Sequence, residues 1–266
     1  MNETLTRALS GVLYIIILVS ATLFLDSFLI LFGLLLSLSV YEFCELVHLN
    51  KVVPLLVAVS CYFMGAYFTS YPSVDFVLLL LFLITAGKAL SFLFNRSEKI
   101  ISPFEKSIYL IGYIVIPFIL LAKLPFIETS FNPKIVISLF ILIWFNDTMA
   151  YVVGKSVGKT KLFVSVSPKK TIEGFVGGLF FSALISIVIA IYYMQEPIAR
   201  WIIIAIIVGI FGTLGDLIES KFKRTAGVKD SGKIMPGHGG VLDRLDSIIF
   251  AGPFVFLFYQ IVNYVS

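Results

Sequence analysis

The sequence predicts an all-α, polytopic integral membrane protein with about nine transmembrane helices and a polar site at its cytoplasmic face. Of its 266 residues, 59% are hydrophobic and 14% are charged, and the mean hydropathy is +1.02. A soluble domain carries about 25% charged residues. Apolar runs occupy nearly the whole length, which leaves no room for a separate soluble domain. Because lipid offers the backbone no hydrogen-bond partner, these runs predict helices; barrel strands would be shorter and alternating.

Nine runs have roughly the 20-residue length that crosses a membrane. They are residues 8–25, 27–47, 52–70, 74–94, 107–126, 134–154, 174–194, 200–218 and 247–265. The first two meet at Asp26 so closely that one broken hairpin is an alternative. The first run lacks a small-residue cleavage site, so we expect a retained helix instead of a signal peptide. We divide the chain into five N-terminal spans, residues 1–133, and a C-terminal region with four spans and two basic loops, residues 134–266.

The positive charges predict which side of the membrane each loop faces. With nine spans, the N-terminus and the even-numbered loops hold sixteen Lys and Arg residues, the odd-numbered loops hold three, and Lys88 lies within a span. Basic loops favour the cytoplasmic side, so we expect the even-numbered loops in the cytoplasm. An error of one span before residue 134 would move the N-terminus to the other side, but it would not separate the two largest loops.

These two loops interrupt the C-terminal region and are expected to share one side. The first, residues 155–173, has five lysines and one opposing carboxylate, Glu173. The second, residues 219–246, holds six of the chain's twenty Lys and Arg residues and five glycines. Because only two spans separate the loops, we expect them to form a single site.

Four aspartates are candidate metal ligands. Asp243 and Asp246 are three residues apart, which places both on one face of a helix at the membrane boundary. They either bind magnesium, which prefers oxygen ligands, or cap the helix N-terminus. Asp216 faces the same boundary, and a third carboxylate favours the metal site. Asp147, within the sixth run beside Asn146, either joins this site or pairs with a lysine of the first loop.

The basic residues and glycines of the two loops are typical of a site for a polyphosphate. An isolated basic loop more often contacts lipid headgroups, but these cations alternate with glycine and carboxylate. The glycines of residues 236–240 let the backbone approach a ligand and direct N–H groups at phosphate oxygens. His238 is a donor to phosphate, an acid or a residue that fixes the loop. The candidate ligand-binding residues are Lys169, Lys170, Ser220, Lys223, Arg224, Lys229, Lys233, Gly237, Gly239, Gly240 and Arg244.

Other polar and small residues are expected to be structural. Glu42, Glu45 and Lys88 lie in or near apolar runs, where side chains that reach the membrane surface or pair at helix ends account for them. The eighth run carries three glycines at every third position, a stripe that suits close helix packing. These glycines are Gly209, Gly212 and Gly215. The nucleotide motifs GxxxxGK[ST] and GxGxxG and the zinc motif HExxH do not occur in the sequence.

Three segments of the C-terminal region resemble the phosphatidate cytidylyltransferases, also called CDP-diacylglycerol synthases. Residues 220–246 contain SKFKR, KDSG and PGHGGVLDRLD in this order. Residues 146–151 read NDTMAY, and residues 167–174 read SPKKTIEG. The N-terminal spans are similar only in their apolar character, so the specific resemblance covers the C-terminal half. No motif position departs in a way that indicates an inactive relative.

The resemblance implies a membrane enzyme that converts CTP and phosphatidic acid to CDP-diacylglycerol and pyrophosphate. It also implies magnesium, with a second cation as an option, and a multi-pass homodimer in the bacterial cytoplasmic membrane; nucleic acid is not expected as a partner. In this hypothesis Asp216, Asp243 and Asp246 hold the cation or cations. Lysines 169 and 170 hold either substrate. The groups that neutralise the triphosphate and the leaving pyrophosphate are Lys223, Arg224, Lys229, Lys233 and Arg244.

Two other classes of function remain open. A CDP-alcohol phosphotransferase or a polyprenyl-phosphate phosphosugar transferase would also use a nucleotide and a lipid phosphate, but the DG…AR…G…D…D array of the former does not occur here. A transporter for an anionic metabolite would carry broken helices at mid-membrane and an internal duplication. The polar site here lies at one face, and the sequence shows no duplication.

Overall fold

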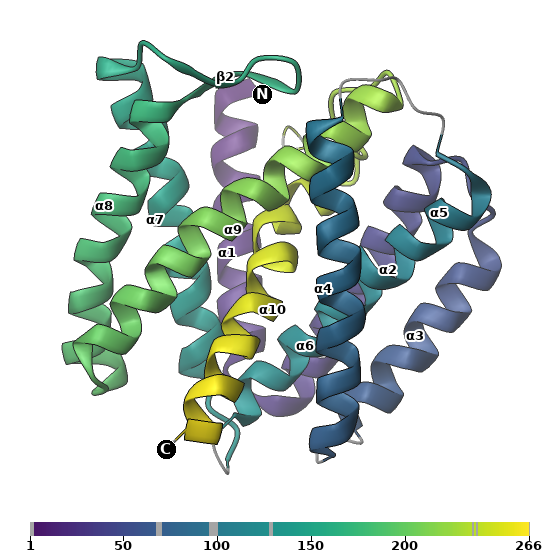
Figure 1. Ribbon diagram of the computed structural model, residues 1–266, viewed down its shortest axis with the longest axis horizontal. Helices are drawn as coiled ribbons and strands as arrows, with labels where there is room; N and C mark the ends of the chain where they lie inside the picture. The colour runs from purple at the N-terminus through teal and green to yellow at the C-terminus, as the bar shows by residue number, and fades with distance from the viewer. Residues whose placement is uncertain are drawn as a thin grey trace.

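The computed structural model of the chain is a bundle of membrane-length helices (Figure 1). It describes residues 3–67, 71–95, 101–127, 130–235, 237 and 239–265. Within this part of the chain, seven helical segments are long and apolar enough to cross a membrane. Two shorter apolar helices, Leu9–Thr22 and Val52–Ala66, lie where the first and third spans were predicted. The all-α membrane fold is therefore confirmed, whereas nine full-length spans are not.

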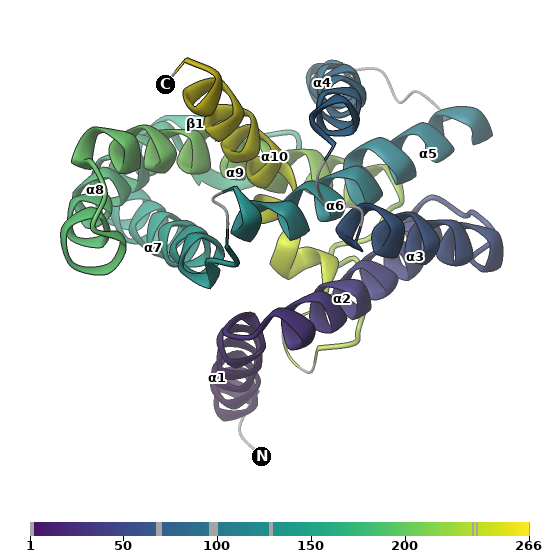
Figure 2. The same cartoon turned by 90° about the horizontal axis from the view of Figure 1, so that it is seen from below.

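The N-terminal helices form one side of the bundle. They are α1 (Glu3–Thr22), α2 (Leu25–Leu46), α3 (Val52–Tyr67), α4 (Pro72–Phe94), α5 (Pro103–Tyr109), the π-helical η1 (Leu110–Val115), α6 (Ile116–Lys123) and the 3₁₀ turn η2 (Leu124–Phe126). The segments from α5 to η2 make one continuous span, which is the most buried of the seven. It starts with a capping box, because Ser102 accepts a hydrogen bond from the N–H of Glu105 and the Glu105 side chain accepts one from the N–H of Ser102. Figure 2 shows α6 in the middle of the bundle, with α5 extending to one edge and α1 at another.

The C-terminal helices form the other side. They are α7 (Pro133–Val157), α8 (Ile172–Val188), the π-helical η3 (Ile189–Met194), α9 (Ile198–Thr225) and α10 (Leu242–Val265). Helix α9 runs diagonally across the bundle and contacts α8, α10 and α4 (Figure 1). The predicted glycine stripe lets it do so: a Cβ on Gly215 would lie 2.7 Å from the Cβ of Phe250 in α10, and a Cβ on Gly209 would clash with Leu179 in α8. Close packing by this stripe is confirmed.

The first polar loop contains a short β-hairpin, which the sequence did not predict. Strands β1 (Lys161–Phe163) and β2 (Ser167–Thr171) are antiparallel, with Lys161 opposite Thr171 and Phe163 opposite Ser167. Thr171 then caps α8, since its hydroxyl accepts a hydrogen bond from the N–H of Gly174 at 3.1 Å. The hairpin lies at the same end of the bundle as the connection between α9 and α10 (Figure 1). The two polar loops therefore share one side, as the topology predicted.

The two halves of the chain pack together at the end of α9 near this polar side. The ring of Phe222 in α9 lies 5.3 Å from Phe43, 4.8 Å from Phe92 and 5.1 Å from Tyr109, all from N-terminal helices. Tyr113 of η1 donates a hydrogen bond to the carbonyl oxygen of Gly215 at 3.1 Å. These contacts fix the part of α9 that carries the candidate site residues.

Candidate functional site

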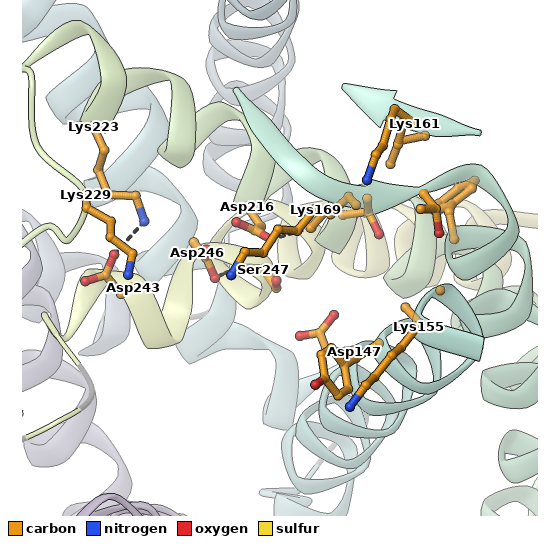
Figure 3. Close-up of a pocket in the computed structure, with 18 of the residues that line it drawn as sticks. Asp147, Lys155, Lys161, Lys169, Asp216, Lys223, Lys229, Asp243, Asp246 and Ser247 are labelled. Carbon is orange, nitrogen blue, oxygen red and sulfur yellow. Dashed lines mark hydrogen bonds and ion pairs between the residues drawn. The ribbon is translucent and has the colours of Figure 1, made fainter. Parts of the chain in front are cut away.

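A cavity of about 780 Å³ lies at the polar end of the bundle, between the β-hairpin, α7, α9 and the start of α10 (Figure 3). This is a volume typical of sites for small molecules and cofactors. Among the described residues, those that line it all lie between positions 147 and 247. Its charged lining consists of Asp147, Lys155, Lys161, Lys169, Lys170, Asp216, Lys223, Arg224, Lys229, Asp230, Asp243, Arg244 and Asp246.

Three carboxylates cluster where α9 and α10 meet. Asp216, Glu219 and Asp246 each place one oxygen within 4.8 Å of the others. Glu219 and Asp246 are buried, and Lys223 forms an ion pair with Oε2 of Glu219. Sequence reasoning missed Glu219. Its spacing of three from Asp216, which puts both on one face of α9, is the signal that could have found it.

Asp243 lies outside this cluster and is surrounded by donors. Its Oδ1 accepts a hydrogen bond from Nζ of Lys223 at 2.6 Å. Its Oδ2 accepts hydrogen bonds from the N–H groups of Ser231 at 2.9 Å and Gly240 at 2.7 Å. All three donors lie outside α10: two belong to the connection before it and one to α9, so Asp243 joins these segments to the first turn of α10. Lys223, predicted to face a ligand, lines the cavity but is buried and paired with both Asp243 and Glu219.

The hairpin contributes a cation to the acidic cluster. Nζ of Lys170 in β2 forms an ion pair with Asp216. Burial lowers the pKa of Lys170, but the carboxylates of Asp216, Asp147 and Asp246 together raise it by more, so the net pKa lies above its ordinary value. Lys169, the preceding residue, is exposed and lines the cavity. Consecutive lysines of β2 therefore have different surroundings: Lys170 neutralises a carboxylate, and Lys169 is available to a ligand.

Exposed cations from both loops face the cavity. Arg224 is oriented by a hydrogen bond from its Nη1 to the carbonyl oxygen of Val228 at 2.9 Å. The prediction left out the lysines of α7 and β1 that contribute to the lining, and Figure 3 shows them beside the same space. The exposed cations of the lining are Lys155, Lys161, Lys169, Arg224, Lys229 and Arg244.

Asp147 lines the cavity from α7, apart from the acidic cluster. Asn146 donates a hydrogen bond to its Oδ1 at 3.4 Å. Figure 3 places Asp147 across the cavity from Asp216 and Asp246. Ser220 lies outside the cavity lining of the described residues and instead donates a hydrogen bond to Oδ1 of Asp216 at 3.2 Å.

The predicted glycine-rich loop is shaped by its backbone. Gly237 and Gly239 have φ angles of +75° and +85°, a conformation that favours glycine. Of the described residues, these two, Gly240 and the exposed Lys233 do not line the cavity. His238 lies outside the described residues. The loop glycines therefore determine the fold of the connection before α10.

The comparison with known proteins agrees with this geometry. Residues 5–262 match the cytidylyltransferase family. The chain belongs to this family. The phosphatidate cytidylyltransferases of Staphylococcus saprophyticus and of Staphylococcus aureus (strain COL) are 53% and 51% identical to it over 116 residues, which are 43% of this chain and 44% of each relative. That of Staphylococcus epidermidis is 46% identical over 130 residues, 48% of this chain and 50% of the relative. These matches span half or less of the relatives' length.

In this cytidylyltransferase family member, one further carboxylate, from the N-terminal half, contacts the connection beside the cavity. Glu42 of α2 is 1% exposed and accepts hydrogen bonds from the connection between α9 and α10. The prediction of helix-end pairing therefore holds for Glu42, but the helix end is the N-terminus of α10 and the partners belong to the connection beside the cavity. It also holds for Glu45, which pairs with Lys51 at 3.3 Å. Lys88 pairs with Glu105 at the start of α5, also at 3.3 Å.

Proposed function

We propose that the chain is a phosphatidate cytidylyltransferase, which transfers the cytidylyl group of CTP to phosphatidic acid and releases pyrophosphate. The observation that carries the proposal is the cavity itself, with exposed cations of two loops on its walls and three clustered carboxylates at the meeting point of α9 and α10. Membership of the cytidylyltransferase family and the names of the relatives support the same reaction. A cavity at the polar end of apolar helices suits one water-soluble and one lipid substrate.

The chemistry of the reaction requires charge neutralisation more than a base. An oxygen of the phosphatidate monoester forms a bond to the α-phosphorus of CTP, and the bond from that phosphorus to the bridging oxygen of the β-phosphate breaks. The bonding electron pair leaves with pyrophosphate. A phosphomonoester has a second pKa of about 6, so the nucleophile is largely ionised near neutral pH. Catalysis then depends on in-line positioning and on cations that stabilise the developing charge.

The exposed cations of the cavity suit these tasks. Arg224, Lys229 and Arg244, on or beside the α9–α10 connection, bind the triphosphate and the leaving pyrophosphate. Lys169 and Lys161, on the hairpin, bind the phosphate of the second substrate or complete the nucleotide site. Lys170 and Lys223 compensate carboxylates that would otherwise repel one another and the substrates.

Magnesium is part of the proposal, and the acidic cluster fits it. The cluster offers three carboxylate oxygens within 4.8 Å of one another, and Glu219 and Asp246 are buried, with Lys223 paired to Glu219. Such oxygen donors match the preference of magnesium. Asp216, Glu219 and Asp246 would hold the ion, and Asp147 on the opposite wall is the candidate ligand for a second cation. When bound, the ion would neutralise charge on phosphate oxygens.

The proposal also includes a membrane orientation and an oligomeric state, both supported by the sequence. The excess of Lys and Arg in the loops that carry the site favours the cytoplasmic side of the bacterial cytoplasmic membrane, where CTP is available. Phosphatidate would keep its headgroup at the boundary, and its acyl chains would enter laterally between helices. The family resemblance favours a homodimer. Light scattering of the purified protein in detergent measures the mass of the assembly and so tests for the dimer.

The decisive experiment uses purified protein with radiolabelled CTP and phosphatidate in detergent micelles. We expect label in the lipid fraction that depends on added phosphatidate, with one pyrophosphate released for each labelled lipid. Label that enters lipid only with another acceptor would indicate a different transferase. Uptake of label into sealed proteoliposomes, with no lipid product, would indicate a transporter and overturn the proposal.

A further inference from the structure

Glu42 of α2 connects to both ends of the segment that precedes α10. Its Oε2 accepts hydrogen bonds from the hydroxyl of Ser231 at 3.0 Å and from the N–H of Leu242 at 2.8 Å. Its Oε1 accepts one from the N–H of Val241 at 3.0 Å. Ser231 lies 189 positions and Leu242 lies 200 positions away in the sequence. Both oxygens act as acceptors, which is the pattern of an ionised carboxylate.

A buried carboxylate is costly unless donors compensate it. Glu42 has three, and two of them are backbone groups at the N-terminus of α10, where a helix lacks internal acceptors for its first N–H groups. The partial positive charge of that helix end also favours an anion. Glu42 therefore serves as a cap for α10 that is supplied by a different helix.

Two glycines of the connection leave the space that Glu42 occupies. A Cβ on Gly232 would clash with the Glu42 carboxylate. A Cβ on Gly240 would clash with Oγ of Ser231 and would lie 2.7 Å from Oε1 of Glu42. Neither glycine has a positive φ. Glycine is therefore required at both positions because the Glu42 carboxylate approaches the backbone closely, and not because of the backbone conformation.

The same segment contacts the site on its other side. The N–H groups of Ser231 and Gly240 donate to Asp243, which accepts in turn from Lys223, and Lys223 pairs with Glu219 of the acidic cluster. Arg244 and Lys229, exposed in the cavity, belong to the start of α10 and to the connection. A continuous series of polar contacts therefore leads from Glu42 to the cavity.

We propose that Glu42 is a positioning residue: it holds the base of the α9–α10 connection and the first turn of α10, and so fixes the cations that bind the nucleotide. The inference rests on the proposed function for the identity of that nucleotide. It makes α2, which lines no part of the cavity among the described residues, a component of the active structure.

The test is the isosteric variant Glu42→Gln. It replaces one of the two acceptor oxygens with an NH₂ group, which cannot accept a hydrogen bond from the backbone N–H groups. The matched control is Glu45→Gln, on the same helix but exposed and paired only at the surface with Lys51. We measure kcat, the KM for CTP, the KM for phosphatidate and the melting temperature in detergent. For Glu42→Gln we expect kcat/KM for CTP to fall about 10- to 100-fold, because small misplacements at a site cost this much. The KM for CTP should rise while the KM for phosphatidate changes less, and Glu45→Gln should match the wild type.

A fall in kcat alone, in proportion to a loss of folded protein, would indicate a merely structural carboxylate and overturn the inference. So would wild-type kinetics in Glu42→Gln. If that variant does not fold, Ser231→Ala takes its place, because it removes one of the three donors and keeps the backbone hydrogen bond to Asp243. In a double-mutant cycle, adding Ser231→Ala to Glu42→Gln should have little further effect on the KM for CTP; full additivity would contradict a shared contact.

A second readout separates this inference from the proposed function. If wild-type protein forms no labelled lipid, the proposed function fails, and hydrogen exchange still tests the role of Glu42. The amides of Val241 and Leu242 should exchange at least about 10-fold faster in Glu42→Gln than in wild type or Glu45→Gln, since they lose their acceptor. Unchanged exchange at these two amides would overturn the positioning role.

Discussion

Nζ of Lys223 lies 2.6 Å from Oδ1 of Asp243 and also pairs with Glu219, so one buried ammonium group joins α9 to the first turn of α10. The cavity and the acidic cluster lie directly beside this junction. The pair Lys223–Asp243 therefore links the stability of the helix packing to the geometry of the site.

Replacement of Lys223 by Met should destabilise the protein by roughly 3–5 kcal/mol, because two buried carboxylates lose their common partner. Thermal unfolding in detergent, followed by fluorescence, measures this change. Lys221→Met is the matched control two residues away. Its Nζ donates to the carbonyl oxygen of Asn95 at the surface, an interaction worth about 0–1 kcal/mol. Equal melting temperatures for the two variants would show that the buried carboxylates do not depend on Lys223.

Asp246→Asn should lower turnover by about 100-fold or more, since a ligand that helps to hold a cation contributes several kcal/mol to the transition state. Glu219→Gln should behave similarly. Both should weaken magnesium binding, which calorimetry measures without turnover. Asp26→Asn, an exposed carboxylate at the start of α2, is the control. Full activity and unchanged magnesium affinity in Asp246→Asn would remove the cluster from the proposed metal site.

Lys169→Gln and Lys170→Gln should have different effects. Lys169 is exposed, so its loss should raise the KM for an anionic substrate and leave the melting temperature within about 1–2 °C of wild type. Lys170 pairs with Asp216, so its loss should lower both turnover and thermal stability. Steady-state kinetics and thermal unfolding of both variants measure these effects. Identical kinetics for Lys170→Gln and the wild type would remove Lys170 from the site.

The raised pKa of Lys170 predicts how its ion pair with Asp216 contributes to the pH dependence of stability. A raised lysine pKa gives a stabilising contribution that is complete below the unfolded pKa and lost only as pH rises through the folded one. Both values lie well above neutral, so this ion pair should persist between about pH 6 and pH 9. Between pH 6 and pH 9, the melting temperature of the wild type should therefore change with pH in the same way as that of Lys170→Gln. A transition present only in the wild type would contradict the assignment.

Gly215→Ala should lower both stability and activity, although it adds only one methyl group. The new Cβ would press on the carbonyl oxygen of Asp246 and lie 2.7 Å from the Cβ of Phe250, which would displace α10 from α9. Overpacking of this kind costs about 1–3 kcal/mol. Gly87→Ala in α4 meets no atom within 4 Å and should be neutral or slightly stabilising. Thermal unfolding and turnover measure both variants, and equal results for them would show that close approach at Gly215 is not required.

The sequence predicted the membrane helices well because their cause is local: a run of apolar residues in lipid must satisfy its own backbone hydrogen bonds. It also predicted that residues 155–173 and 219–246 share one side, since only two spans separate them. Within the cavity, Asp216, Asp246 and Lys170 do meet. The hairpin was missed because two strands of three and five residues inside a lysine-rich loop give little signal.

The choice among carboxylates was beyond the sequence. A three-residue spacing puts Asp243 and Asp246 on similar faces of α10, but it does not say what each side chain meets. The crossing of α9 and α10 at Gly215 brings Asp246 to Asp216 and Glu219, while the connection before α10 surrounds Asp243 with donors.

Hydropathy, charge and motif were enough to predict the fold class, the polar end and the two basic loops, because these depend on local composition. The packed helices were needed to show that Glu219 belongs to the acidic cluster and that Glu42 contacts the start of α10. The cause is separation along the chain: the partners of Glu42 lie 189 to 200 positions away, and such contacts exist only after the helices have packed.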